Sequence, residues 1–252
     1  MRHGARIAVI VPAHGEEHLI GRTLEGIPDW VDFVFVVDDA SPDRTSEVAR
    51  SVNDPRVCCL RHRANRGVGA AIVTGYLRAL QANADVLAVM AGDNQMDPSD
   101  LQRVIAPVAR GEADYVKGNR FVHPESQRMP AERRLAGRWL ARLTRLATGL
   151  QVDDTQCGYT ALSARAARRL ELDSLWPRFG YPNDLLGMLA AAHLRVVEVG
   201  VRPVYADEQS AVRPWHALTV VGVVARRWWL SRRAPEPREA NVLDGRQRRE
   251  PA

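Results

Sequence analysis

Acidic side chains gather directly after three short apolar runs in the first half of the chain. They are Glu16, Glu17, Asp38, Asp39, Asp93 and Asp97. If the apolar runs are neighbouring strands, these carboxylates share one rim of a sheet, where their mutual repulsion costs stability. A cluster of this kind usually binds a divalent cation or accepts hydrogen bonds from sugar hydroxyls. The pattern therefore predicts a site for a cation, a sugar or both.

Some of these acids have a simpler alternative role. Asp39, Ser41 and Asp43 are residue types that cap helices and form turns without binding any ligand. This alternative explains single residues better than it explains the whole set.

The elements that must position these acids alternate regularly. Short β-branched runs predict strands at residues 7–11, 33–37, 57–60, 86–90 and 115–116. Apolar residues at helical spacing predict helices at residues 16–27, 41–51, 68–81 and 98–109. This alternation predicts an α/β fold with a mostly parallel central sheet and helices on both faces. Ligands bind such sheets beyond the carboxyl ends of the strands.

The second half is less regular. We expect an arginine-rich helix at 131–148, a loop at 153–158, a strand at 159–162, a helix at 184–192 and a strand at 196–201. Residues 1–210 would then form a single domain. Residues 234–252 are polar and lack apolar periodicity, which predicts a disordered tail.

Residues 211–233 join a short apolar run to several tryptophans and arginines and contain no acid. A membrane-spanning helix needs about 20 apolar residues, and this run is far shorter. We expect an amphipathic helix at a membrane interface. The alternative is a C-terminal helix packed on the protein's own core.

Composition excludes several protein classes. The chain has 252 residues, of which 46% are hydrophobic and 26% are charged, as in soluble globular proteins. The net charge of +5 comes from the C-terminal part, because residues 1–212 hold 26 basic and 26 acidic side chains. A neutral body gives no support for nucleic-acid binding. The three cysteines, Cys58, Cys59 and Cys157, lack zinc-site spacing and are expected to be buried free thiols.

Four motifs in order resemble the signatures of glycosyltransferase family 2. They are VPAHGEE at 11–17, VDDASPD at 37–43, NRGVGAA at 65–71 and AGDNQMDP at 91–98. The resemblance continues through GNRF at 118–121, DTQCGY at 154–159 and VRPVYADEQS at 201–210. Within the family, the chain is most similar to dolichol- and polyprenol-phosphate sugar transferases.

The resemblance implies a GT-A fold, a Rossmann-like architecture, and an inverting transfer from a nucleotide-sugar donor such as GDP-mannose or UDP-glucose. The residues it implies for donor binding are Pro12, Ala13, Glu16, Asp39, Gly92 and Asp93. Asp93 and Gln95 stand where the family holds Mg²⁺ or Mn²⁺ on the diphosphate. A cation there would stabilise the negative charge that grows on the leaving group.

One position departs from the family pattern. The metal motif usually begins with an acid two residues before Asp93, and this chain has Ala91. One metal-binding carboxylate is therefore missing, and affinity for the cation without nucleotide should be poor. A catalytically impaired homologue that only binds nucleotide sugars is the alternative function.

The implied acceptor is a polyprenyl phosphate or a similar molecule. Its oxygen is already anionic at neutral pH, so it needs cations to hold it and no general base. The resemblance places Arg120, Arg133, Arg134 and Arg138 on the acceptor side. Asp184 stands near the catalytic base of related transferases that act on hydroxyl groups, and it could instead cap the following helix.

A family arginine for the diphosphate also has no direct counterpart. Glu208 stands close to its place, and Arg202 or Arg213 could substitute for it.

A dinucleotide-dependent oxidoreductase shares the βα alternation but should carry a GxGxxG turn after the first strand. PAHGEE occupies that turn here. We further expect a cytoplasmic location with peripheral membrane contact, because no signal-peptide core precedes the first strand. The residues select neither the nucleotide nor the sugar.

Overall fold

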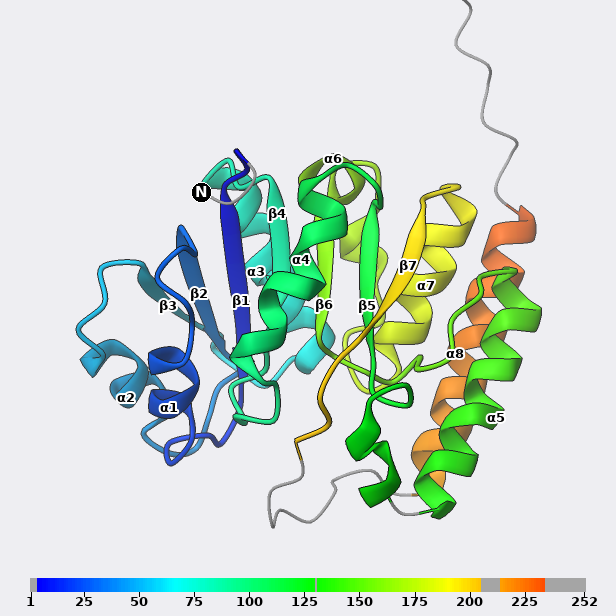
Figure 1. Ribbon diagram of the computed structural model, residues 1–252, viewed down its shortest axis with the longest axis horizontal. Coiled ribbons are helices and arrows are strands. Elements are labelled where there is room, and N and C mark those ends of the chain that lie inside the picture. Colours follow the sequence, from blue (N-terminus) through cyan, green and yellow to red (C-terminus); the bar gives the residue numbers. More distant parts are fainter. Residues whose placement is uncertain (1–3, 130, 205–213, 234–252) are drawn as a thin grey trace, which may run out of the picture.

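The computed structural model describes residues 4–129, 131–204 and 214–233. A seven-stranded sheet forms its centre and runs from β3 at one edge to β7 at the other (Figure 1). The strands are β1 (Ile7–Ala13), β2 (Phe33–Asp38), β3 (Val57–Arg61), β4 (Val86–Val89), β5 (Tyr115–Asn119), β6 (Thr160–Ser163) and β7 (Val196–Gly200).

The strand order is β3-β2-β1-β4-β6-β5-β7. Only β6 runs antiparallel to its neighbours, pairing Thr160 with Val89 of β4 and with Lys117 of β5. The other pairs are parallel. The expected mostly parallel sheet is confirmed. The position of β6 between β4 and β5 was not predicted, because the hydrophobic pattern of one strand does not indicate which strands pair with it.

Helices cover both faces of the sheet, as predicted. One face carries α1 (Ile20–Glu25), α2 (Thr45–Ser51) and α4 (Leu101–Ala109). The other face carries α3 (Val68–Gln81), α6 (Ala164–Ala167) and α7 (Tyr181–Ala191). Alternate β1 side chains show the division, since Val9 packs with the first set and Ile10 with the second. Both side chains are fully buried.

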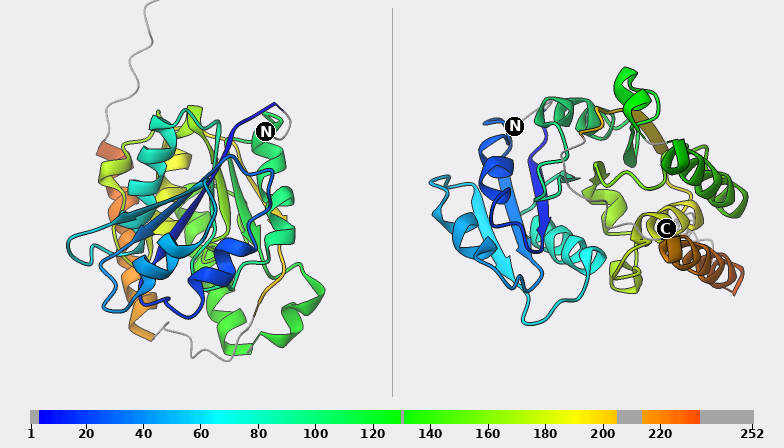
Figure 2. Two further views of the ribbon diagram at one scale, coloured as in Figure 1. Left: turned by 90° about the vertical axis from the view of Figure 1, so that its left-hand side faces the viewer. Right: turned by 90° about the horizontal axis from the view of Figure 1, so that it is seen from below.

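Two longer helices form a further layer outside α7. They are α5 (Ala131–Thr148) and α8 (Pro214–Arg233), which lie side by side at the β7 end of the molecule (Figures 1 and 2). Val220 and Val223 of α8 are buried, and Val223 lies against Gly180 at the start of α7. These two side chains of α8 therefore pack on the protein itself. The predicted tail at 234–252 lies outside the described residues.

Several predicted helix starts are too early. Helix α1 begins at Ile20 because Glu16 starts a turn in which its carbonyl accepts the N–H groups of Leu19 and Ile20. Helix α2 begins at Thr45, and a 3₁₀ turn, η1 (Pro98–Asp100), precedes α4. Side-chain hydrogen bonds accompany the other two late starts. Asp97, for example, accepts the N–H of Ser99 and caps the 3₁₀ turn.

Two further 3₁₀ helices, η2 (Pro124–Arg128) and η3 (Leu172–Ser174), complete the described elements. The three cysteines are free thiols, as expected. Cys157 is buried, but Cys58 and Cys59 on strand β3, at the sheet edge, are only half-buried, which corrects the expectation of burial for that pair.

Candidate functional site

Two adjoining cavities open beyond the strand ends and meet at Asp93. The β1-side cavity, of about 290 Å³, is lined by residues that follow β1, β2 and β4. The β5-side cavity, of about 320 Å³, is lined by residues near the ends of β4, β5 and β7 and by the start of α7. Pro12, Val68, Ala91 and Asp93 line both cavities. The site thus has two compartments with a common wall.

All six predicted donor-binding residues line the β1-side cavity. They are Pro12, Ala13, Glu16, Asp39, Gly92 and Asp93. Gly92 fits closely, because a Cβ there would lie 3.0 Å from Ile20 and 3.1 Å from Ala13. His14, Asn65 and Gly67 complete much of the wall and were not named from the sequence as binding residues.

Hydrogen bonds from within the protein hold the Asp39 carboxylate in place. Its oxygens accept hydrogen bonds from His62 Nδ1 at 2.7 Å, from the N–H of Arg66 at 2.9 Å and from the N–H of Gly67 at 2.6 Å. Burial alone would raise its pKa, but these hydrogen bonds outweigh burial and hold the pKa of Asp39 below its ordinary value. Asp39 therefore fixes the loop that leads into α3 while one edge of it faces the cavity.

Gly67 must be a glycine at the end of this loop. Its φ is +96°, which side chains rarely adopt, and a Cβ would lie 2.5 Å from the carbonyl oxygen of Pro177. The neighbouring acid Asp38 is fully buried and is bonded by Ser41, Ser46 and Arg61. Of the paired acids, Asp38 is structural and Asp39 borders the cavity.

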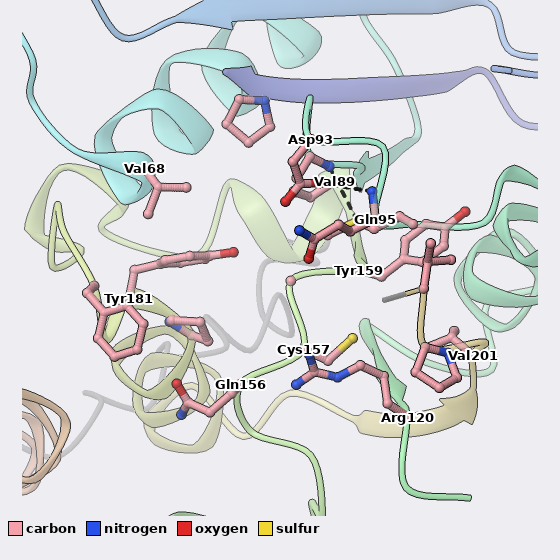
Figure 3. A pocket seen from close by; sticks show the side chains of 18 of the residues that line it. Val68, Val89, Asp93, Gln95, Arg120, Gln156, Cys157, Tyr159, Tyr181 and Val201 are labelled. Carbon is pink, nitrogen blue, oxygen red and sulfur yellow. Dashed lines mark hydrogen bonds between the residues drawn. The ribbon is translucent and has the colours of Figure 1, made fainter. Parts of the chain in front are cut away.

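Asp93 lies on the shared wall, and Gln95 lies beside it on the wall of the β5-side cavity (Figure 3). Asp93 Oδ1 accepts the N–H of Gln95 at 3.0 Å, which fixes the turn between them. Ala91 also lines both cavities, so a longer side chain there would reach the same space. Within the described residues, no group of three or more His, Cys, Asp or Glu side chains could hold a metal ion alone.

The two oxygen donors fit a hard cation whose other ligands come from phosphate and water. They do not form a complete metal site by themselves. The structure is thus consistent with the sequence expectation that Mg²⁺ or Mn²⁺ binds here together with a nucleotide.

Arg120 projects into the β5-side cavity from the end of β5 (Figure 3). Asp154 holds it in a two-point ion pair, with Nε to Oδ2 at 2.7 Å and Nη2 to Oδ1 at 2.9 Å. Asp154 is 1% exposed. Burial would raise its pKa, but the Arg120 guanidinium outweighs burial and lowers the pKa of Asp154 below its ordinary value. Arg120 is therefore a fixed cation on the cavity wall.

Lys117 supports the same wall from beneath. It is fully buried, and its Nζ donates a hydrogen bond to the carbonyl of Cys157 at 2.6 Å. Burial lowers its pKa from the ordinary value. Neither Lys117 nor Asp154 was named from the sequence as a site residue. A signal was present, because Lys117 is the only lysine in the chain.

Gln156 and Tyr181 also line the β5-side cavity and were not predicted as site residues (Figure 3). Gln156 Nε2 donates to Asn183 Oδ1 at 2.6 Å, and Asn183 Nδ2 donates to Thr144 of α5 at 2.8 Å. This chain of hydrogen bonds connects the cavity wall to both α7 and α5.

The remaining predicted acceptor arginines lie on α5, and of the two whose side chains are described, neither lines a cavity. Arg138 is exposed, Arg134 is half-buried, and the side chain of Arg133 lies outside the described part of the structure. Arg202 lines the β5-side cavity, where its Nε contacts Glu125 at 2.9 Å. Glu208 and Arg213 lie outside the described residues.

Asp184 does not line either cavity. It is fully buried in the first turn of α7, which begins at Tyr181 with Gly180 as its N-cap, so Asp184 is not the cap. Arg227 of α8 binds both of its oxygens at 2.7 Å, and the N–H of Trp176 adds a bond at 2.8 Å. This carboxylate connects two helices and has no access to a substrate in the cavity.

Comparison with known proteins decides the family. The model of glycosyl transferase family 2 matches residues 8–170. The chain belongs to this family. The chain is therefore a glycosyltransferase, and the matched range holds every strand that borders the β1-side cavity.

Relatives in sequence act on lipid phosphates, according to their names. The undecaprenyl-phosphate mannosyltransferase of Micrococcus luteus is 33% identical over 206 residues, which cover 78% of this chain and 82% of that protein. The UDP-N-acetylglucosamine–dolichyl-phosphate N-acetylglucosaminyltransferase of Methanococcus voltae is 28% identical over 221 residues, covering 81% and 88%.

Solved structures confirm the GT-A fold. Glucosyl-3-phosphoglycerate synthase from Mycobacterium tuberculosis, determined with Mn²⁺, UDP and glucosyl-3-phosphoglycerate, superposes with a TM-score of 0.70. Its identity is 21%, and the match covers 90% of this chain and 81% of that one. Mannosyl-3-phosphoglycerate synthase from Rubrobacter xylanophilus gives a TM-score of 0.72 at 16% identity, covering 95% and 79%. Among the described helices, none is long and apolar enough to cross a membrane.

Proposed function

We propose that this glycosyltransferase moves a sugar from a nucleoside-diphosphate donor to a polyprenyl phosphate, with inversion at the anomeric carbon. The observation that carries the proposal is the pair of cavities that meet at Asp93. One compartment holds the residues expected to bind a nucleotide sugar. The other presents a fixed cation, Arg120, toward the same wall. A donor and an anionic acceptor could therefore meet at Asp93.

In this proposal the nucleotide lies in the β1-side cavity. Glu16 and Asp39 offer carboxylate oxygens to base or ribose hydrogen-bond donors, and His62 keeps Asp39 in position. The diphosphate lies at the shared wall beside Asp93 and Gln95. A Mg²⁺ or Mn²⁺ ion bound there would stabilise the charge on the leaving diphosphate. The solved relative with Mn²⁺ and UDP supports this arrangement at the level of the fold.

The acceptor lies in the β5-side cavity. A phosphate monoester is already ionised at neutral pH, so the reaction needs charge neutralisation and orientation, not proton removal. Arg120 and Arg202 are the cations that line this cavity. The burial of Asp184 beneath Arg227 agrees with this chemistry, because no general base is required. The names of the sequence relatives support a lipid-phosphate acceptor.

A catalytically impaired nucleotide-sugar binder is the second candidate. Ala91 on the shared wall favours it, because this position lacks the carboxylate that would complete a stronger metal site. Transfer to a polyprenyl phosphate, measured with labelled GDP- and UDP-sugars and Mn²⁺, distinguishes the two. The first function predicts a glycosylated lipid phosphate. The second predicts donor binding without product.

Replacing Asp93 tests the shared wall directly. We expect nucleotide-sugar binding to strengthen with Mg²⁺ or Mn²⁺ in the native protein and to lose that dependence in Asp93→Ala. Calorimetric titrations with metal and with EDTA measure both affinities. Asp97→Ala is a useful control, because Asp97 is also acidic and near but caps η1 instead of lining either cavity. Equal affinity with EDTA and with metal in the native protein would show that the assigned metal site is wrong.

A further inference from the structure

The outer face of α5 exposes a stripe of large apolar side chains. Leu135 is 71% exposed, Trp139 is 53% exposed and Leu146 is 78% exposed. These residues are spaced by four and seven positions, so they lie on one face of the helix. The opposite face is buried, as Leu140, at 8% exposure, shows. Together with Arg142, which falls between Trp139 and Leu146 on the same face, they are called the α5 stripe below.

The charged side chains between Glu132 and Asp153, two acids that flank this part of the sequence, are all basic. Residues 133–152 contain no acid, and neither do residues 211–233. Arg138 and Arg142 are exposed on α5, and Arg226 is exposed on the neighbouring helix α8. Trp229 of α8 adds another exposed aromatic side chain, at 48%. Leucine, tryptophan and arginine on one surface are the combination that anionic membrane interfaces bind.

The stripe lies close to the candidate acceptor compartment. Gly137, between Leu135 and Trp139 in the sequence, packs against Phe121, and a Cβ there would lie 2.8 Å from the Phe121 ring. Phe121 directly follows Arg120, which lines the β5-side cavity. On its buried face, α5 also reaches the cavity through Thr144, Asn183 and Gln156. A membrane that contacted the outer face of α5 would therefore be separated from Arg120 by the thickness of this helix.

Among the described side chains of α8, the apolar ones are less available for such contact. Val220 and Val223 are buried, and the Arg227–Asp184 ion pair holds the helix on α7. The sequence expectation placed the membrane contact on residues 211–233 alone. Among the described side chains, α5 exposes three large apolar residues and α8 exposes one, Trp229.

We propose that the α5 stripe docks the protein on an anionic lipid surface. This inference rests on the proposed function, since a polyprenyl phosphate acceptor resides in a membrane. A second copy of the chain fits the stripe less well. A two-fold contact between stripes would bring Arg138 and Arg142 close to the same residues of the other copy. Anionic headgroups instead complement these arginines while the apolar side chains enter the interface.

The test uses the full chain and vesicles without any substrate. Vesicles of phosphatidylcholine alone are compared with vesicles that also contain phosphatidylglycerol, at low and high salt. The stripe variant is Leu135→Gln/Arg142→Gln. The control variant, Leu77→Gln/Arg168→Gln, removes one exposed apolar and one exposed arginine side chain on other helices or their ends. We expect salt-sensitive binding to anionic vesicles that weakens at least about tenfold in the stripe variant and stays unchanged in the control.

Several outcomes would overturn the inference. They are no binding of the native chain to anionic vesicles at low salt, equal losses in both variants, or a native dimer that only the stripe variant dissociates. Light scattering after gel filtration detects the last outcome and assigns the stripe to a second copy. Circular dichroism and urea unfolding establish that both variants are folded.

A transfer assay separates this inference from the proposed function. With a short-chain, water-soluble polyprenyl phosphate, the stripe variant should retain native transfer although it binds vesicles weakly. Native transfer without vesicle binding would refute the stripe and leave the function intact. Vesicle binding without transfer would refute the function and leave the stripe intact.

Discussion

Ala91 limits how tightly the shared wall can hold a divalent cation. Its side chain lines both cavities, two residues before Asp93. We predict that Ala91→Asp tightens binding of Mn²⁺ in the absence of nucleotide, because a second carboxylate offsets part of the cation's lost hydration. Calorimetry with Mn²⁺ alone measures the change, which we expect to be about tenfold or more. Ala91→Asn, of similar size but neutral, should give a smaller gain.

The outcome that contradicts this prediction is unchanged Mn²⁺ affinity in a folded Ala91→Asp protein. Faster transfer is not required, because tighter metal binding before donor arrival does not itself stabilise the transition state.

Residue types and motif order were sufficient to bring together residues that line the β1-side cavity, but not most of those that build the β5-side cavity. The predicted donor residues lie at the ends of β1, β2 and β4, which are neighbouring parallel strands, and topology alone brings such strand ends together. The wall of the β5-side cavity depends on Lys117, Asp154 and Gln156, whose contacts cross between β5, a loop and α7. The spacing of hydrophobic residues along the sequence does not predict contacts of this kind. Asp184 shows the same limit, since only the packed structure reveals its partner Arg227 on a distant helix.

At the scale of elements, a buried ion pair fastens α8 to α7. Asp184 is fully buried, and the Arg227 side chain is 13% exposed. We predict that Arg227→Met lowers the free energy of unfolding by about 3 kcal/mol, because it leaves a buried carboxylate without its cation. Urea unfolding followed by circular dichroism measures the loss.

Arg226→Met is the matched control for this prediction. Arg226 lies 3.6 Å from the same carboxylate but is 40% exposed, so its removal should cost less than about 1 kcal/mol. Adding Asp184→Asn to Arg227→Met should restore part of the loss, because the unpaired charge is removed. Equal losses for Arg226→Met and Arg227→Met would contradict the assigned geometry.

A second buried acid joins β5, β7 and α6. Asp114 accepts the N–H of Arg195 at 2.9 Å and contacts the guanidinium groups of Arg165 at 2.8 Å and Arg195 at 3.2 Å. Burial would raise its pKa, but these contacts outweigh burial and lower the pKa of Asp114 to about 2. The ordinary value for aspartate is about 3.9. The carboxylate therefore stabilises the fold above pH 4, and this contribution is lost as the pH falls toward 2.

We predict that Asp114→Asn lowers the free energy of unfolding by about 2 kcal/mol at neutral pH. The variant should also lose less stability than the native protein between pH 4 and pH 2. Urea unfolding at several pH values tests both statements, with Asp173→Asn, an exposed acid, as control. A native and variant difference that stays constant down to pH 2 would contradict the predicted linkage.

The predicted elements were most accurate where a hydrophobic period was long and uninterrupted. Residues 68–81 and 131–148 were predicted as helices with the bounds that the structure shows for α3 and α5. Helix starts near the strand ends were less accurate. There the side chains of Thr45 and Asp97 accept the backbone N–H groups of Glu16 and Ser99, which lie outside the α-helices. Such local hydrogen bonds compete with helix initiation and are weakly encoded in apolar spacing.

At the scale of the whole molecule, donor binding should stabilise the entire domain. Its compartment is built from residues that follow β1, β2 and β4 and from the start of α3, so a bound nucleotide contacts distant parts of the sheet and helices. A donor at about 100 times its Kd should add about 2.7 kcal/mol to the free energy of unfolding. Thermal unfolding with GDP- and UDP-sugars, with and without Mn²⁺, measures the effect. If no nucleotide shifts the transition, the compartment does not bind nucleotide sugars.

The antiparallel strand β6 has a consequence for how the chain is made. Strands β1 to β4 are complete once residue 89 is synthesised, but β4 finds its second neighbour only at residues 160–163. At about 5–20 residues per second on the ribosome, that interval lasts about 4–15 s. During this time the apolar edge Val86–Val89 has an open row of hydrogen-bonding groups. The nascent chain is thus most prone to aggregation after β1 to β4 have formed and before β6 fills the middle of the sheet.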